Sequence, residues 1–354
     1  MADSRRRVLD VLAHRIPDRV PYFELLISQA VISALHPGLD YLGFCEVEDV
    51  DVVFTKWNFA NRWLDEAGGI YTNEWRMIRK HGAEQTDDYL DGPIHSMEDL
   101  RCFESPDPLA QSGFRNLEEA VSRFGGRRMI CFSTKATFNH IWYLMGGMEE
   151  YLVAMYTEPQ LVLAINEICS AYHLTQVERA LELGADMILL ADDYAFRQNA
   201  FIPRDKFREF CLPAIRRMVE LVHARGRHVL FHSDGKLDEF LDLIVDSGVD
   251  LLHPLEPGAM DIARTYQDYR ARVVICGNVD CAHTLSFGEP QDARREVLWL
   301  LENIAPGGRF ILTSSNTIHS QVRADTYRAM LDTLSEYGRY PIHMGRCADG
   351  AAKP

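Results

Sequence analysis

The sequence lacks several features that define whole classes of protein. It contains no apolar run approaching the roughly 20 residues of a membrane-spanning helix, and residues 1–7 lead into no apolar segment like that of a signal peptide. Basic residues are in the minority: the formal net charge is −15 over 354 residues. Sequence-independent nucleic-acid binding needs a basic surface. We therefore expect a cytoplasmic protein that binds neither nucleic acid nor a membrane.

Paired cysteines and glycine-rich loops are also missing. The eight cysteines are scattered, and none forms a Cys-x-x-Cys pair, which is typical of reduced thiols and argues against a zinc finger. No Gly-x-Gly-x-x-Gly or Walker-type loop follows any strand-like run. The absence of such a loop disfavours a doubly wound nucleotide-binding sheet, which is the main alternative for a chain of this kind.

Short apolar runs that break into polar, titratable residues are the main pattern that is present. Residues 229–231 run into His232, Ser233 and Asp234. Such a run indicates a buried parallel strand that ends in a functional loop. The same pattern recurs at 186–191 before Asp192 and Asp193, at 249–254 before Glu256, at 273–276 before Asn278 and Asp280, and at 310–313 before Asn316.

Three further strand-like runs, at 19–24, 50–55 and 128–133, bring the number of predicted strands to eight. Helix-length segments separate most of them. Eight strands that alternate with helices predict an α/β fold, the (β/α)8 or TIM barrel, whose active site lies at the carboxyl ends of the strands.

Residues 58–110 interrupt this alternation. Alternating residues at 68–78 and turn signals at 91–93 and 105–108 predict an inserted hairpin or loop excursion after the second strand. We expect residues 1–342 to form a single barrel domain that includes this insertion. Residues 343–354 would then be a C-terminal tail.

A barrel would gather the polar strand ends around one cavity. Crowded carboxylates repel one another, which raises pKa values and suits proton transfer or metal binding. His232 and Asp234 stand two residues apart, so on a strand they face the same side. The predicted catalytic residues are His232, Asp234, Glu256, Asp192, Asp193, Tyr143 and Asn316, and the predicted metal ligands are His232, Asp234 and Glu256.

Several of these residues have a structural alternative. Asp192 or Asp193 can cap a helix, and Tyr143 can belong to the packing between elements. Asn278 and Asp280 can form a plain turn, and His232 can be a hydrogen-bonded histidine at the barrel mouth.

Six short stretches, at 136–147, 190–195, 231–235, 253–257, 277–280 and 305–308, carry a resemblance when taken in order. Over residues 5–342 the chain resembles the uroporphyrinogen decarboxylase superfamily, which implies a (β/α)8 barrel. It departs from the true decarboxylase at the residues that matter. The N-terminal arginine signature is missing from residues 19–26, the catalytic aspartate corresponds to Lys56, and the late histidine corresponds to Asn316. Tyr143 and the 277–280 turn do match.

The resemblance also extends to cobamide-dependent methyltransferases, which exchange methyl groups between a small molecule and a corrinoid protein. Some of these hold zinc through His-x-Cys and a distant cysteine. Here His232 matches the histidine, Asp234 takes the place of the first cysteine, and Ser314 or Ser315 falls near the second. This pattern is similar to methoxyaromatic O-demethylases.

The resemblance therefore implies a methyltransferase whose cobalamin arrives on a partner corrinoid protein. A methoxyaromatic compound is the expected type of substrate, and a homodimer is left open. The predicted substrate-binding residues are Trp57, Trp142, Tyr194, Asn278 and Asp280. Two alternatives stand beside it: a decarboxylase or lyase for another carboxylated substrate, and a barrel that binds a small molecule without catalysis.

Overall fold

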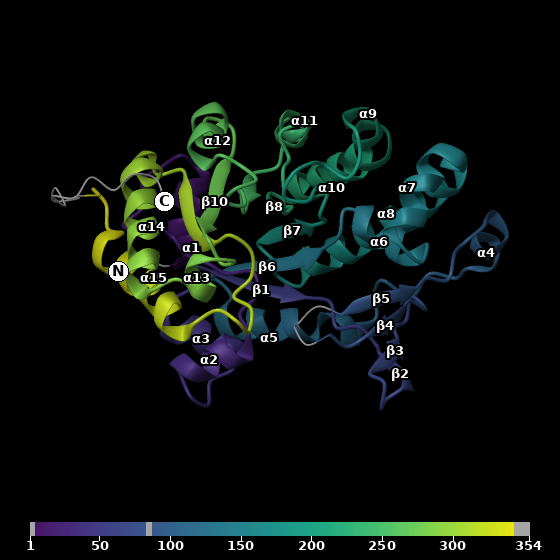
Figure 1. Cartoon of the computed structure of the whole chain (residues 1–354), viewed down its shortest axis with the longest axis horizontal. Coiled ribbons are helices and arrows are strands. Elements are labelled where there is room, and N and C mark those ends of the chain that lie inside the picture. The colour runs from purple at the N-terminus through teal and green to yellow at the C-terminus, as the bar shows by residue number, and fades with distance from the viewer. Residues whose placement is uncertain (1–3, 83–86, 343–354) are drawn as a thin grey trace.

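Seven parallel strands form the main sheet of the computed structural model, which describes residues 4–82 and 87–342. The predicted tail at 343–354 lies outside the described residues. The strands pair in chain order, each with the next one in the sheet (Figure 1). Their bounds are β1 (Val52–Lys56), β6 (Met129–Thr134), β7 (Met187–Ala191), β8 (His228–His232), β9 (Leu251–His253), β10 (Val274–Val279) and β11 (Phe310–Ser314).

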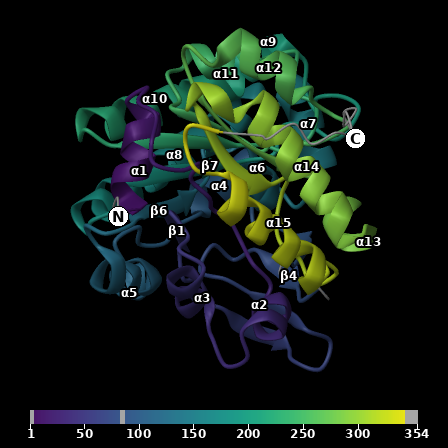
Figure 2. The same ribbon diagram turned by 90° about the vertical axis from the view of Figure 1, so that its left-hand side faces the viewer.

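These strands are buried almost throughout, which explains why they read as continuous apolar runs. Helices connect them, and Figure 2 shows the last two long helices side by side in front of the sheet. The helices are α1 (Ser4–Leu12), α2 (Gln29–Leu35), α3 (Tyr41–Val47), α4 (Met97–Cys102), α5 (Arg115–Phe124), α6 (Phe138–Leu144), α7 (Met148–Thr157), α8 (Pro159–Glu182), α9 (Arg204–Lys206), α10 (Leu212–Ala224), α11 (Leu241–Asp246), α12 (Ile262–Tyr269), α13 (Thr284–Phe287), α14 (Pro290–Asn303) and α15 (Ala324–Tyr337).

The first predicted strand, at 19–24, is not a strand of the sheet but a short connecting segment between its two edge strands. Leu312 N–H on β11 donates to Pro21 O at 2.9 Å, and Phe23 N–H donates to Leu312 O at 3.3 Å. Asp51 N–H, just before β1, donates to Tyr22 O at 2.9 Å. Pro21 has no N–H and cannot extend this pairing. Residues 21–23 therefore link β11 to the start of β1, and the seven-stranded sheet is compatible with a barrel.

A separate four-stranded antiparallel sheet lies between β1 and α4 in the chain, within the region where the sequence departs from the barrel pattern. Its strands are β2 (Arg62–Asp65), β3 (Ile70–Thr72), β4 (Ile78–Lys80) and β5 (Asp88–Asp91), paired in that order. In Figure 1 it extends away from the helices of the C-terminal half. Contacts between β5 and α6 join it to the main body.

The turn expected at 277–280 is largely strand. β10 continues through Gly277 and Asn278 to Val279, paired with Leu312 to Ser314 of β11. Polar and glycine residues did not end this strand because Asn278 is buried and its Nδ2 donates to Leu255 O at 2.6 Å. Among the described helices, none combines the length and apolarity needed to cross a lipid bilayer.

Candidate functional site

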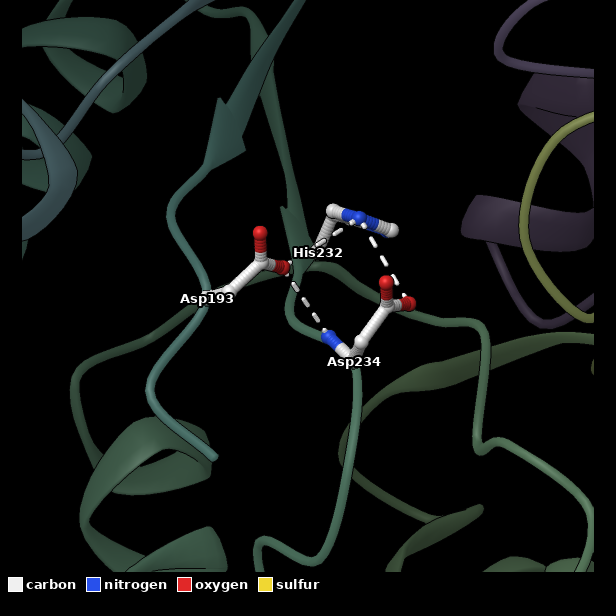
Figure 3. Close-up of side chains that lie close together, drawn as sticks. All are labelled: Asp193, His232 and Asp234. Carbon is white, nitrogen blue, oxygen red and sulfur yellow. Dashed lines mark hydrogen bonds and ion pairs between the residues drawn. The ribbon is translucent and has the colours of Figure 1, made fainter. Parts of the chain in front are cut away.

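The carboxyl ends of β7 and β8 bring together Asp193, His232 and Asp234 (Figure 3). One ligand-type atom from each of the three lies within 4.8 Å of the others. His232 Nε2 is 3.7 Å from Asp193 Oδ1 and 3.8 Å from Asp234 Oδ1. Asp234 N–H also donates to Asp193 Oδ1 at 3.2 Å. Ala191 and His232 are paired in adjacent strands, so the residues that follow them emerge side by side.

The imidazole of His232 is fixed from behind by a second histidine. Its Nδ1 forms a 2.8 Å hydrogen bond with Nδ1 of His253, the residue beside it on β9. Burial lowers the pKa of His232, which Asp193 opposes. The neutral ring is therefore favoured. When His232 donates the bond to His253, its Nε2 presents a lone pair toward the two carboxylates, which favours a proton or a cation in the gap.

Asp234 is the most perturbed member of the cluster. Burial raises the pKa of Asp234 well above its ordinary range, and the nearby carboxylates of Asp193 and Glu256 raise it further. Asn316 Nδ2 donates to Asp234 Oδ2. The other oxygen, Oδ1, is buried without a hydrogen-bond partner in the described part of the chain. A carboxyl group whose pKa is raised in this way favours its protonated form and can release the proton to a bound molecule.

Gly235 explains the sharp turn after Asp234. Its φ is 80°, and a Cβ at this position would come within 2.6 Å of the carbonyl carbon of Ala195. The Gly235 N–H donates to Glu256 Oε2 at 3.0 Å. Glu256, a predicted metal ligand, thus supports the loop and lies outside the three-residue cluster, whereas Asp193 supplies the third ligand group beside His232 and Asp234.

The cluster fits the ligand chemistry of a divalent metal. A neutral imidazole and two carboxylates are common zinc ligands, and the buried Asp234 Oδ1 without a partner is the kind of atom that an ion would satisfy. Asp193, His232 and Asp234 are the residues that would hold such an ion.

The two adjacent aspartates after β7 differ in burial: Asp192 is buried, whereas Asp193 is partly exposed. Asp192 is buried and accepts hydrogen bonds from the Thr137 and Asn139 N–H groups at 2.8 and 3.2 Å, at the start of α6. Burial raises the pKa of Asp192, and these bonds and Lys135 oppose the rise. Asp192 therefore binds the start of α6, a helix earlier in the chain, and not the helix that follows it, which was the expected structural alternative. Tyr194 is fully buried and donates to Asp192, so no face of its ring is open to a ligand.

Three neighbouring cavities open around the strand ends. A cavity of about 530 Å³ is lined by Asp193 and His232, and one of about 390 Å³ by Asp234, Glu256, Asp280 and Asn316. The cluster lies where these two meet. Asn278 lines a third cavity together with Asp280, of about 280 Å³. Asp280 also accepts hydrogen bonds from the N–H groups of Ala282 and His283 at 2.8 and 2.9 Å, so it shapes its own loop.

The inserted sheet covers a further cavity of about 280 Å³, here called the insertion cavity. Trp57 and Tyr143 line it, and the Tyr143 ring stacks on Tyr89 of β5 at 3.6 Å. Trp142 is half-buried and packs edge-on against Tyr143 at 3.9 Å, and it does not line this cavity. Of the three aromatic residues predicted to contact a substrate ring, only Trp57 borders one of these cavities.

Two cavity residues were missed at the sequence level. Lys135, immediately after β6, lines both the insertion cavity and the 530 Å³ cavity, and its ammonium donates to Ala191 O. Its position after an apolar run is the signal that was available. Arg79 comes from β4 of the insertion, where no sequence pattern indicated a site.

Glu24 is a buried acidic residue beside the carboxyl end of β11. Its carboxylate accepts hydrogen bonds from Ser314 N–H at 2.9 Å and Ser314 Oγ–H at 2.5 Å. Burial raises the pKa of Glu24 from its ordinary value of 4.5 to about 8, although both hydrogen bonds oppose the rise. The folded chain therefore keeps a proton that the unfolded chain releases.

This difference makes stability depend on pH. Between pH 4.5 and about 8, the unfolding free energy contributed by Glu24 should fall as pH rises, because the unfolded state binds fewer protons. Glu24→Gln stays neutral and should lose this decline. Urea unfolding of both proteins at pH 5 and pH 8.5 measures the effect. An equal drop in both proteins would show that Glu24 is not responsible.

A comparison with models of protein families shows to which family the chain belongs. The family model described as uroporphyrinogen decarboxylase (URO-D) matches residues 82–337, well over half of the chain. The chain belongs to the uroporphyrinogen decarboxylase family. Within it, the Asp193–His232–Asp234 cluster and its cavities occupy the carboxyl ends of the family's parallel strands.

Curated relatives and a solved structure of the same fold carry different names. Uroporphyrinogen decarboxylase from Chlorobium limicola is 34% identical over 167 residues, which cover 44% of each chain. Uroporphyrinogen decarboxylase from Chlorobaculum tepidum is 32% identical over 225 residues, covering 60% of this chain and 61% of that one. The chain thus matches less than two thirds of the length of these curated relatives. A solved methyltransferase from Methanosarcina mazei shares the fold, with a TM-score of 0.74, 17% identity and coverage of 95% and 99%.

Proposed function

We propose that this family member transfers a methyl group from a small methylated compound, such as a methoxyaromatic, to a corrinoid carried by a partner protein. The single observation that supports it best is Asp234, a half-buried carboxyl group whose buried Oδ1 has no hydrogen-bond partner among the described residues, beside His232 at the junction of two cavities. Demethylating an ether leaves an oxygen that needs a proton, and a protonated carboxyl at a cavity wall can supply one.

The charge around the cluster argues against a polyanionic porphyrinogen as substrate. Asp193, Asp234 and Glu256 face the same region, and their pairwise repulsion is already evident in the raised pKa of Asp234. A substrate with several carboxylates would add like charges to this wall, which is unfavourable.

In the proposed reaction, a corrinoid held by the partner protein would supply the acceptor for the methyl group, and the bond between the methyl carbon and its oxygen would break. The oxygen keeps the bonding electrons and receives the Asp234 proton. Asn316, which donates to Asp234 Oδ2, orients the carboxyl group so that Oδ1 is free to act. His232, held by His253, fixes the position of Asp193 and Asp234 relative to the bound molecule. If Asp193, His232 and Asp234 instead hold a zinc ion, Asp234 would be a deprotonated ligand, and the ion would supply Lewis-acid stabilisation of the leaving oxygen in place of the Asp234 proton.

The test is methyl transfer to reduced cobalamin. The purified chain, incubated with veratrole-type ethers and with methylamines, should consume cob(I)alamin in an ether-dependent manner, followed by its absorbance. Metal analysis of the same preparation, and assays with and without a chelator, report whether an ion takes part. No turnover across the panel would count against the proposal.

Decarboxylation of another carboxylated substrate is the second candidate. The observation in its favour is the insertion cavity, whose described lining contains Lys56, Arg79 and Lys135 but no carboxylate. Release of carbon dioxide in the absence of cobalamin would select this reaction over methyl transfer.

A further inference from the structure

The insertion cavity has the charge of an anion-binding site. Lys56 at the end of β1 and Arg79 on β4 both line it, together with Lys135, and no Asp or Glu is among its described lining residues. The exposed Lys56 side chain has no hydrogen bond or ion pair with another described residue. Desolvation lowers the pKa of Lys56 and the nearby Arg79 lowers it further, whereas the Asp87 carboxylate opposes the shift.

Arg79 is only partly compensated within the chain. Its guanidinium lies 3.8 Å from Asp87, and its Cζ lies 4.3 Å from the centre of the Tyr89 ring. Asp87 is shared, because it also accepts hydrogen bonds from Tyr71 Oη at 2.5 Å and His81 Nδ1 at 2.7 Å. Arg79 Nε is buried and has no hydrogen-bond partner among the described residues. Two cations that face one cavity with an unused donor are best satisfied by a bound anion.

The walls of the insertion cavity suit a flat ring. Tyr143 is stacked on Tyr89, and Trp57 has its polar Nε1 occupied by Glu74 at 2.8 Å, which leaves the apolar part of the indole for packing. Phe59, 45% exposed, adds an open aromatic edge. Aromatic rings favour offset or edge-to-face contact with another ring.

The insertion cavity continues into the catalytic region. Lys56, Ser133 and Lys135 line both this cavity and the 530 Å³ cavity that contains Asp193 and His232. β1 and β8 are three strands apart in the sheet, roughly 14 Å along it at the usual spacing. The long side chain of Lys56 and the side chains of the cluster shorten this gap, so that one substituted ring can extend from one end to the other.

We propose that the methyl donor is an aromatic carboxylate, with its carboxylate bound by Lys56 and Arg79 and its ring against Tyr143 and Trp57. This inference rests on the proposed methyl transfer, because it names the substrate of that site. Arginine presents two parallel N–H donors that match a carboxylate, and lysine adds a mobile charge. The methoxy group at the far end of the ring then points toward Asp234.

Equilibrium binding tests the carboxylate site independently of turnover. Isothermal titration calorimetry of the full chain compares 3,4-dimethoxybenzoate with 3,4-dimethoxybenzyl alcohol, which has the same ring and no charge. Lys56→Gln and Arg79→Gln should each weaken benzoate binding by about tenfold or more, and leave binding of the alcohol unchanged. Lys80→Gln is the matched control, because Lys80 neighbours Arg79 on β4, is exposed and faces the opposite side of the strand.

The outcomes separate the parts of the inference. Equal affinity of the wild type for benzoate and alcohol, or benzoate affinity that survives both substitutions, overturns the carboxylate site. Inorganic phosphate that binds as tightly as the benzoate overturns the role of the ring. Benzoate binding that depends on Lys56 and Arg79, with no methyl transfer to cob(I)alamin, supports the carboxylate site and overturns the proposed function. A thermal melt of each variant verifies folding. If Arg79→Gln unfolds, the benzoate affinity of Lys56→Gln decides the test, because the Lys56 side chain has no hydrogen bond or ion pair to another described residue that the substitution would remove.

Discussion

Replacing Asp234 with Asn is expected to lower kcat for methyl transfer by about 10²- to 10⁴-fold, the usual contribution of a positioned general acid. The amide keeps the size of the side chain and retains an oxygen to accept the Asn316 hydrogen bond. It cannot deliver the proton that the leaving oxygen needs. The loss should appear equally in kcat and kcat/KM, since the interaction is made in the transition state. Steady-state kinetics with a methoxyaromatic donor and reduced cobalamin measure it.

Asp238→Asn is the matched control for this substitution. Asp238 lies four residues further along the same loop and is exposed, so removal of its charge should leave kcat and KM unchanged. Wild-type kcat in Asp234→Asn would exclude a proton-donating role for this residue and would remove the main support for the proposed mechanism.

Asp51→Ala is expected to lower the unfolding free energy by about 3 kcal/mol, the low end of the usual cost of breaking a buried ion pair, because both of its arginine partners keep a second carboxylate. Asp51 is completely buried and forms ion pairs with Arg7, which is 4% exposed, and with Arg19 at 3.0 Å. Its Oδ2 also accepts the Tyr22 N–H at 2.8 Å. The substitution removes the buried carboxylate that pairs with Arg7 and leaves that guanidinium with the partly exposed Asp18 at 2.7 Å. It also weakens the link between residues 21–23 and β1. Urea unfolding followed by circular dichroism gives the change.

Asp49→Ala provides the comparison for Asp51. Asp49 also forms an ion pair with Arg19 at 3.0 Å, but its side chain is 58% exposed. Exposed pairs contribute about 1 kcal/mol or less, so this variant should remain close to the wild type. Equal losses in the two variants would mean that burial does not set the strength of these pairs.

Most of the main sheet could be predicted from the sequence because its strands are buried on both faces and read as apolar runs. The 228–232 strand is an example: its end at His232 is also where the polar residues begin. The run at 19–24 looks similar, yet Pro21 restricts it to a few bridging hydrogen bonds. β10 was underestimated because Gly277 and Asn278 resemble a turn, and only the tertiary contact of Asn278 shows why the strand continues.

The convergence of Asp193, His232 and Asp234 followed from strand ends meeting at one edge. The sequence could not tell Asp192 from Asp193, because neighbouring residues leave the chain in different directions and only the position of α6 decides which one is covered. Tyr194 looked like a ligand-facing ring for the same reason. The position of Arg79 in the cavity wall could not be predicted from the sequence, since it depends on how the inserted sheet folds over the strand ends.

The position of the inserted sheet has an evolutionary consequence. The proposed proton donor, Asp234, resides on the loop after β8, while Arg79 and Tyr89 reside on β4 and β5, in a module with its own hydrogen-bond ladder. Natural selection can therefore exchange residues in that module and redirect the enzyme to new compounds while the reactive groups stay as they are.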